Sequence, residues 1–105
     1  MKLARFLTTL IKDRLQTKWL DATVQVFDDS HLHSRGANSH FRVLVVCDQF
    51  EGKGPVDRRK EVFKALNEFW NQGVHSISVS TFTVKEFDGN VPGTVGCVNR
   101  VGKNN

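Results

Sequence analysis

The spacing of apolar residues along the first part of the chain predicts an amphipathic helix. From about Lys2 to Leu15, apolar residues recur every three or four positions, with lysine and arginine between them. Such a stripe is typical of a helix that packs one face against a sheet. The stripe consists of Leu3, Phe6, Leu7, Leu10, Ile11 and Leu15. A basic amphipathic targeting segment is the alternative interpretation, and Asp13 speaks against it because such segments avoid acidic residues.

Three later stretches have the composition of β-strands. The first, ATVQVFD at residues 22–28, places Val24 and Val26 on one face. The second, HFRVLVVC at 40–47, is apolar on both faces, which is typical of a strand in the centre of a sheet. In the third, VHSISVSTF at 74–82, Ile77 and Val79 alternate with serines, so we expect one buried and one solvated face. The segment DSHLHSRGANS between the first two strands is rich in Ser, Asn and Gly, which predicts a loop.

A second helical region lies between the second and third strands, over residues 50–73. Pro55 suits the first turn of a helix, and Gly73 suits its end. The region is long enough for two helices with a break near Asn67. Its predicted buried stripe consists of Val62, Phe63, Leu66, Phe69 and Trp70. A short helical turn is expected at 83–89.

The order of these elements is α-β-β-α-α-β, which predicts an α/β (α+β) fold with a mixed three-stranded sheet. The first two strands can form an antiparallel hairpin, and the helical crossover permits parallel pairing of the third. We expect the helices to pack on one face of the sheet. Residues 1–89 are predicted to form one domain, and residues 90–105, which show no periodicity, a flexible tail.

Composition adds information about charge, membranes and redox compartment. The 105 residues have a formal net charge of +4, which permits contact with phosphates or with an acidic partner but does not require it. No apolar run approaches the length needed to span a membrane. Cys47, in an apolar run, is expected to be buried, and Cys97 to be an exposed thiol. Because they form no disulfide framework, we expect the cytoplasm or mitochondria rather than secretion.

The loop between the first two strands contains the candidate metal ligands. His31 and His33 form an H-x-H pair, and residues i and i+2 of an extended segment point the same way. Two imidazoles could therefore converge on a Zn, Cu, Fe or Ni ion, although a solvated polar loop would have the same sequence. His40 starts the second strand and is expected to serve its structure. His75, at the start of the third strand, becomes a candidate ligand only if the loop with His33 lies beside it.

The sequence offers no constellation of catalytic residues. No nucleophile has a credible base and orienting partner, and neither a phosphate-binding P-loop nor a dinucleotide-binding GxGxxG occurs. We therefore expect a protein that is not an enzyme. The start of the second helical region gathers four cations, which predict either an anion, nucleic-acid or partner contact or a solvated helix face. They are Lys53, Arg58, Arg59 and Lys60.

Several segments together resemble the BolA family. They read DDSHLH, SHFRVLVVCDQFEGK, RRK and GVHSISVSTFTVKEF, and the similarity runs from about Leu3 to Gly89 with the same order of elements. The resemblance implies a BolA-like fold similar to the type II KH domain. It also implies a monothiol glutaredoxin as partner, with a [2Fe-2S] cluster bridging the heterodimer. Roles in iron–sulfur cluster maturation or trafficking, or in iron regulation, would follow.

The same resemblance assigns the cluster ligands. The family uses the histidine of the VH segment, here His75, and a histidine or cysteine of the loop, which the alignment of DSHLH places at His33. His31 is a possible secondary ligand. The partner side would supply a cysteine and a glutathione thiol, so no cofactor is expected in the isolated chain, which we expect to be a monomer. Imidazole ligands on one iron of such a cluster have a precedent in Rieske centres.

The chain departs from the family pattern at two points. The R-H-R common in the second helix reads Arg58-Arg59-Lys60, which keeps the basic character without the histidine. Gly52-Lys53-Gly54 is not the GXXG loop with which KH domains clamp nucleotides. A KH-like, nucleic-acid-binding transcriptional regulator remains the alternative function, and an independent zinc or copper module on the H-x-H pair is a third.

Overall fold

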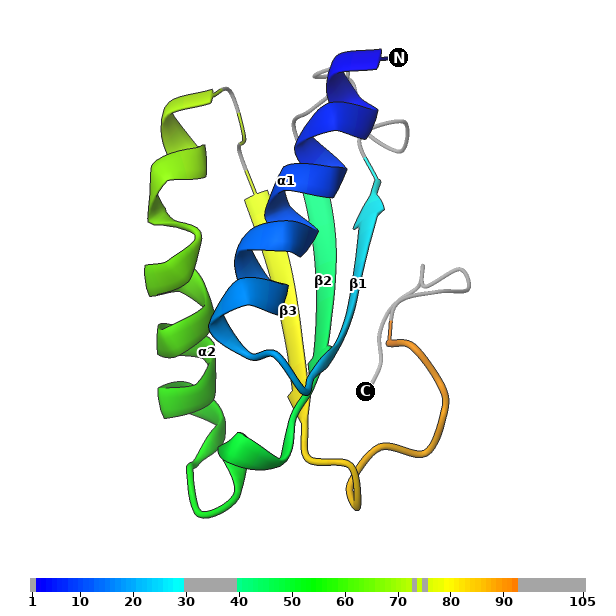
Figure 1. Cartoon of the computed structure of the whole chain (residues 1–105), viewed down its shortest axis with the longest axis vertical. Coiled ribbons are helices and arrows are strands. Elements are labelled where there is room, and N and C mark those ends of the chain that lie inside the picture. The colour runs from blue at the N-terminus through cyan, green and yellow to red at the C-terminus, as the bar shows by residue number, and fades with distance from the viewer. Residues whose placement is uncertain (1, 30–39, 73, 75, 93–105) are drawn as a thin grey trace.

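A computed structural model describes residues 2–29, 40–72, 74 and 76–92 of the chain (Figure 1). The elements follow the predicted order. They are α1 (Lys2–Lys18), β1 (Thr23–Asp28), β2 (His40–Val46), the 3₁₀ turn η2 (Asp48–Phe50), α2 (Pro55–Ala65), the 3₁₀ helix η3 (Asn67–Gln72) and β3 (Ser76–Phe82). No helix in this part of the chain is long and apolar enough to cross a membrane.

The strands form one mixed sheet in the order β1-β2-β3. β1 pairs antiparallel with β2, from Thr23 opposite Val46 to Asp28 opposite Phe41. β3 runs parallel to β2, because α2 and η3 return the chain to the end of the sheet at which β2 starts. The predicted mixed sheet and the central place of the VLVV strand are therefore confirmed.

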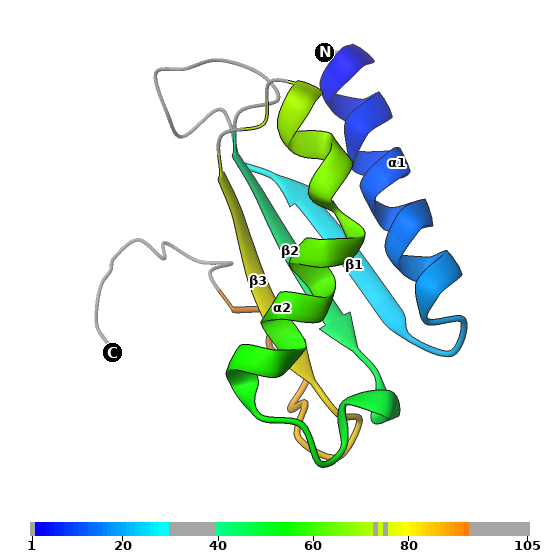
Figure 2. The same ribbon diagram turned by 90° about the vertical axis from the view of Figure 1, so that its left-hand side faces the viewer.

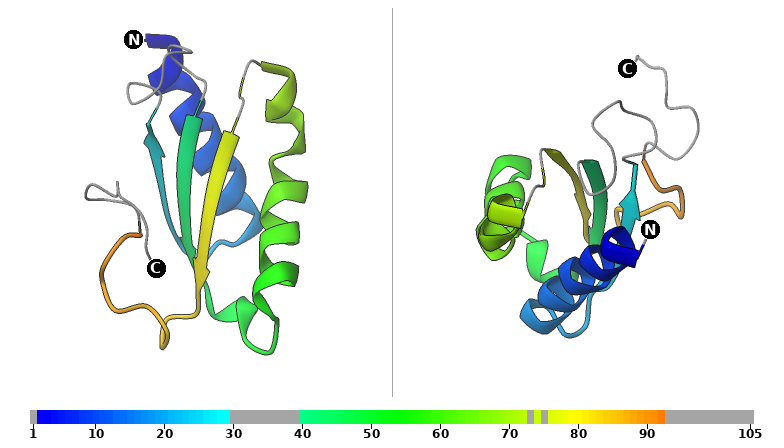
Figure 3. Two further views of the ribbon diagram at one scale, coloured as in Figure 1. Left: turned by 180° about the vertical axis from the view of Figure 1, so that it is seen from behind. Right: turned by 90° about the horizontal axis from the view of Figure 1, so that it is seen from above.

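Both long helices cover the same face of the sheet, as Figure 2 shows from the side and Figure 3 from behind and above. The core between helices and sheet is apolar and closely packed, with Trp19 of the α1–β1 turn meeting Phe50 edge-on at 5.3 Å between ring centroids. Each fully buried side chain of this kind contributes about 1.5–3 kcal/mol. The largest are Leu7, Ile11, Leu15, Phe41, Phe50, Leu66 and Phe69. β2 is buried on both faces, since Leu44 and Val46 on the helix-free side are also buried.

The helical region breaks where the sequence predicts a break. α2 starts with Pro55 at its first position and ends at Ala65, and the Leu66 N–H lies within hydrogen-bonding distance of both the Val62 and Phe63 carbonyls. Such a shared bond is common where a helix tightens at its end. The tighter 3₁₀ winding of η3 follows directly.

Two sequence-based expectations need correction in the helices. α1 continues to Lys18, one turn beyond the predicted end near Leu15. Trp70 is not part of the buried stripe, because 37% of it is exposed and its ring stacks on Phe63 at 6.3 Å. Neighbouring residues of a 3₁₀ helix differ in direction by a third of a turn, so Phe69 and Trp70 cannot both face the core.

The segment after β3 turns at residues 84–86 and then runs along the helix-free side. The N–H groups of Glu86 and Phe87 both bond to the Thr83 carbonyl, which forms a single turn within the segment where the sequence predicts a short helical turn. The Phe87 ring packs against Phe82 with 5.3 Å between centroids. The predicted tail begins within the described chain but continues beyond it, since residues 93–105 lie outside the described residues.

Candidate functional site

The segments that contain the predicted ligands adjoin the starts of β2 and β3 in sequence. His31, His33 and His75 themselves lie outside the described residues, but the residues that flank them in sequence do not. His40 at the start of β2 is the register partner of Ser76 at the start of β3. The Asp29 N–H donates a 2.9 Å hydrogen bond to the His40 carbonyl, which joins the two ends of the 30–39 segment. The end of β1 and the starts of β2 and β3 therefore meet at one end of the sheet.

An ion pair on the helix-free face clamps this end. The Arg42 guanidinium donates to both carboxylate oxygens of Asp29, over 2.9 Å from Nε and 3.2 Å from a terminal nitrogen. Only 15% of the Arg42 side chain and 21% of the Asp29 side chain are exposed. Arg42 also lies 4.3 Å above the centre of the Phe27 ring, and it donates to the Pro92 carbonyl at 3.5 Å. A bidentate, stacked arginine is among the stronger polar contacts, so the clamp fixes both ends of the histidine-bearing segment.

The described part of this end does not by itself hold a metal. No group of three or more His, Cys, Asp or Glu side chains suited to a metal ion occurs among residues 2–29, 40–72, 74 and 76–92. Cys47 is buried at the opposite end of β2, as predicted, and its N–H bonds to the Phe82 carbonyl. His40 is half-buried in the first position of β2, which agrees with its predicted structural role.

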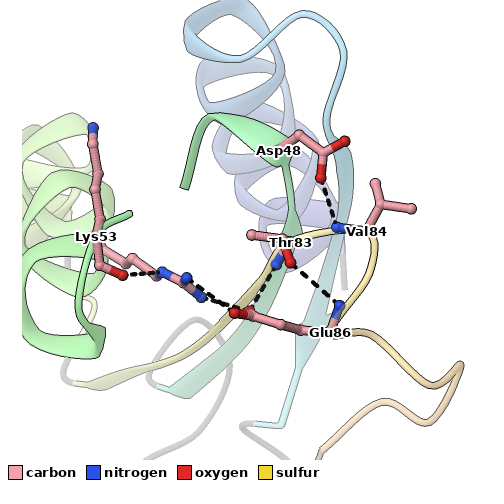
Figure 4. A network of polar contacts seen from close by, with 6 residues as sticks. Asp48, Lys53, Thr83, Val84 and Glu86 are labelled. Atoms are coloured by element: carbon pink, nitrogen blue, oxygen red, sulfur yellow. Dashed lines mark hydrogen bonds and ion pairs between the residues drawn. The ribbon is translucent and has the colours of Figure 1, made fainter. Parts of the chain in front are cut away.

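The four cations predicted to form a cluster at the start of α2 lie in different environments. Arg58 is not a surface cation, as the sequence suggested, but a buried one. Its guanidinium turns inward, with 11% of the side chain exposed, and donates to the two Glu86 carboxylate oxygens at 2.7 and 3.2 Å (Figure 4). Its Nε donates to the Lys53 carbonyl at 2.8 Å, and it lies 5.7 Å from the centre of the Phe50 ring. Arg58 precedes the buried Val62 by four residues and so belongs to the inner face of α2.

Glu86 is the centre of this network. Its carboxylate also accepts the Thr83 N–H at 2.9 Å, and its own N–H bonds back to the Thr83 hydroxyl at 3.2 Å. The hydrogen bonds from Arg58, with a further one from the Thr83 N–H, lower the pKa of Glu86 to about 2. The same pairing raises the pKa of Arg58. Nearby, the Asp48 carboxylate accepts the Val84 N–H at 3.0 Å (Figure 4).

The other three cations of the cluster remain on the surface. Lys53 is half-exposed and paired with Glu61 over 2.6 Å. Arg59 and Lys60 are exposed, and they point to different sides of α2 because neighbouring helix residues lie about 100° apart. Lys53 and Lys60 line one hollow, whereas Arg59 does not, so the four cations do not form one surface patch.

A group of cations that the sequence did not indicate lies between α1 and α2. Arg14 and Lys18 of α1 and Lys64 of α2 line one hollow, although the two helices are distant in sequence. Only the packing of the helices brings these positions together, so no local spacing could reveal them. Lys64 also lines a neighbouring hollow, together with Lys60.

Comparison with known proteins agrees with this architecture. Residues 15–86 match the family model for BolA-like proteins. The DNA-binding transcriptional regulator BolA of Escherichia coli strain K12 is 31% identical over 81 residues, which cover 75% of this chain and 77% of that protein. The solved structure of BolA1 from Arabidopsis thaliana superposes with a TM-score of 0.72 at 28% identity, over 76% of this chain and 94% of that one.

A second solved structure, the BolA domain of SufE1 from Arabidopsis thaliana, has a TM-score of 0.69 at 25% identity and covers 74% of this chain and 92% of that one. The family model, the sequence relatives and the solved structures thus agree with the observed helices and mixed sheet, and the chain belongs to the BolA family.

Proposed function

We propose that this chain is a non-enzymatic partner of a monothiol glutaredoxin and shares a bridging [2Fe-2S] cluster with it through His33 and His75. The observation that supports the proposal is the pairing of His40 with Ser76. His75 directly precedes Ser76 in sequence, and the segment containing His33 ends at His40. We therefore expect both histidines near the same end of the sheet.

The donor chemistry suits half of a cluster. A [2Fe-2S] cluster takes four protein ligands, and two imidazoles can replace two thiolates on one iron, with a rise in reduction potential. Two histidines from this chain would leave two positions for thiolates from the partner side. When bound, the cluster would be the cargo that the two proteins hold jointly. Neutral imidazoles leave the site less negative than thiolates do and can be protonated, which would ease release of the cluster.

The Arg42–Asp29 clamp supports the same proposal by fixing the segment that carries His33 at both ends. Asp29 precedes the segment, and its backbone is bonded to His40, which follows it. A ligand segment with fixed ends loses less conformational entropy when its histidines are ordered on a cluster. Arg42 and Asp29 would act as positioning residues rather than as ligands.

Reconstitution of the complex tests the proposal. The chain would be mixed with a monothiol glutaredoxin, glutathione, iron and sulfide, and the visible absorption and circular dichroism of the cluster recorded. A heterodimer spectrum distinct from that of the glutaredoxin homodimer is expected, and His33→Ala and His75→Ala should each abolish it. His40→Ala is the control for loss of a histidine at the same end of the sheet. His31→Ala should change the spectrum only if His31 is a ligand.

If both His33→Ala and His75→Ala leave the spectrum and the lifetime of the cluster unchanged, the proposal is wrong. Metal retained by the isolated chain and lost in His31→Ala would favour an independent zinc or copper module instead.

Nucleic-acid binding is the second candidate function. The relative from Escherichia coli is named a DNA-binding transcriptional regulator, and this chain has exposed cations on α2 that pair with no carboxylate among the described residues. Binding of the KH type is not proposed, because Gly52-Lys53-Gly54 does not form a GXXG loop. A gel-shift with a strong dependence on salt would support this function.

A further inference from the structure

Two neighbouring hollows lie along α2, and one of them reaches the last turns of α1; together we call them the groove. The hollows have volumes of about 640 and 410 Å³ and share Glu61 and Lys64 in their walls. The larger hollow reaches Arg14 and Lys18 of α1, and the smaller one extends to Lys60 and the start of α2. Two separate helices thus build the groove.

The groove is positively charged, and part of that charge is not neutralised. Five of its side chains are cationic and two are acidic. Arg14 is bound by Glu68 outside the groove, through contacts of 2.5 and 3.0 Å, and Lys53 is bound by Glu61. Among the described residues, Lys18, Lys60 and Lys64 have no carboxylate partner, and Lys18 contacts only the Trp19 ring, 5.1 Å from its centre. We call these three the groove lysines.

The two acidic side chains of the lining do not neutralise the charge of the groove lysines. Glu61 is occupied by Lys53, and the remaining acid, Asp57, lies in the first turn of α2, where the helix dipole stabilises its charge. Lys60 and Lys64 are four residues apart on α2, so they lie about one helical turn, or about 6 Å, apart along the helix axis. Lys18, in the last turn of α1, lines the same hollow as Lys64.

The lining favours phosphate groups over a peptide. Ala65 is the only apolar residue among those that line the two hollows, whereas grooves that bind helical or proline-rich peptides rely on apolar or aromatic anchors. The lining also contains no aromatic ring on which a base could stack. Lysine ammonium groups are point charges that bind phosphates without reading sequence.

We propose that the groove lysines bind the sugar-phosphate backbone of duplex nucleic acid, without sequence preference. This inference rests on the second candidate function and gives it a site. The site differs from the cluster of cations that the sequence suggested, since Arg58 is turned inward and Arg59 lies outside the lining. The groove also lies near the C-terminal end of α1, away from the end of the sheet at which β2 starts (Figure 2).

Fluorescence anisotropy with the full chain tests the assignment. The probe is a labelled mixed-sequence DNA duplex of about 20 base pairs, titrated between about 50 and 200 mM salt. The variant Lys18→Gln/Lys60→Gln/Lys64→Gln should bind at least about tenfold more weakly, and its salt slope should fall by up to about 2.7, since each neutralised phosphate contributes about 0.9. A second duplex of shuffled sequence should give the same affinity.

A matched control removes the same charge elsewhere. Lys12 and Lys85 are exposed and lie outside the groove lining and outside α2, so Lys12→Gln/Lys85→Gln should stay within about threefold of the wild type. Lys60→Gln/Lys64→Gln removes the same charge from the groove and should weaken binding more than this control does. Thermal melting of the variants confirms that they are folded.

The possible results separate the site from the function. If Lys12→Gln/Lys85→Gln weakens binding as much as Lys60→Gln/Lys64→Gln does, the groove assignment is wrong and nucleic-acid binding stands as a property of net charge. If the wild type does not bind the duplex at about 50 mM salt, both are wrong. If poly-glutamate displaces the duplex and binds the wild type more tightly, the groove instead serves an acidic protein partner. None of these results depends on the cluster with glutaredoxin.

Discussion

Arg58 and Glu86, 28 positions apart in the sequence, are joined by two hydrogen bonds of 2.7 and 3.2 Å. The contact ties the first turns of α2 to the turn that follows β3. Because Arg58 also donates to the Lys53 carbonyl, three segments of the fold are held by one side chain. A residue that the sequence offers as a surface cation is thus part of the internal structure.

Replacing Arg58 by alanine should lower the free energy of unfolding by about 2 kcal/mol. The loss combines charge-assisted hydrogen bonds with the contact of the guanidinium with the Phe50 ring, and it stays below the cost for a fully buried pair because Glu86 is nearly half exposed. Urea denaturation measures it. Arg59→Ala, one position along on the exposed side, should change stability by no more than about 0.5 kcal/mol. Equal effects of the two substitutions would contradict a structural role for Arg58.

The stability of the fold should fall with acid in a window set by Glu86. Its pKa in the folded chain is lowered to about 2, chiefly by the hydrogen bonds from Arg58, whereas an unfolded glutamate titrates near 4.3. Its contribution is therefore complete above about pH 4.3 and is lost as the pH falls toward about 2. Melting temperatures of the wild type and Glu86→Gln should differ at neutral pH and converge through this window. A gap that stays constant down to pH 2 would exclude Glu86 as its source.

Substituting Arg42 should loosen the end of the sheet at which β2 and β3 start. Arg42→Lys keeps the charge but loses the planar fork that binds both Asp29 oxygens and the stacking on Phe27. We expect a loss of about 1 kcal/mol and faster hydrogen exchange of the Asp29 amide, which bonds to His40. Ser78→Ala, at the register partner of Arg42 on β3, is the control. Unchanged exchange at Asp29 would show that the clamp does not hold the segment.

The neighbouring aromatic residues of η3 should respond very differently to truncation. Phe69→Ala should cost about 3–5 kcal/mol, because its fully buried ring leaves a cavity. Trp70→Ala should cost about 1 kcal/mol, because its ring is partly exposed and stacks only on Phe63. Chemical denaturation of both variants measures the difference. Similar losses would mean that Trp70 is more tightly packed than its exposure indicates.

The sequence predicted the fold well where one rule dominated. The continuous apolar run of β2 required burial on both sides, and that alone placed the strand in the centre of the sheet. The helical crossover made the parallel pairing of β3 the natural solution. Trp70 was misassigned because apolar spacing assumes a regular α-helix, and η3 winds more tightly.

The environment of the charged residues was harder to predict. Arg58 stands four residues before Val62, a spacing that could have indicated an inward position, but its charge suggested the surface. The compensating Glu86 lies beyond another strand, so no local pattern connects the two. The groove lysines likewise depend on how α1 packs beside α2. The predicted ligands His33 and His75 stay predictions, which rest on the family resemblance and on the strand register.

The central place of β2 also has a consequence for synthesis of the protein. When residues up to Val46 have left the ribosome, α1, β1 and β2 can associate, but β2 still presents one free edge with the apolar run VLVV. That edge is covered only after the whole crossover and β3 have been made, since Val43 pairs with Val79. Nascent chains that stall in between would expose an unpaired hydrophobic strand, a known starting point for aggregation. The interval of translation between the second and third strands is thus the period in which this small protein most needs a chaperone.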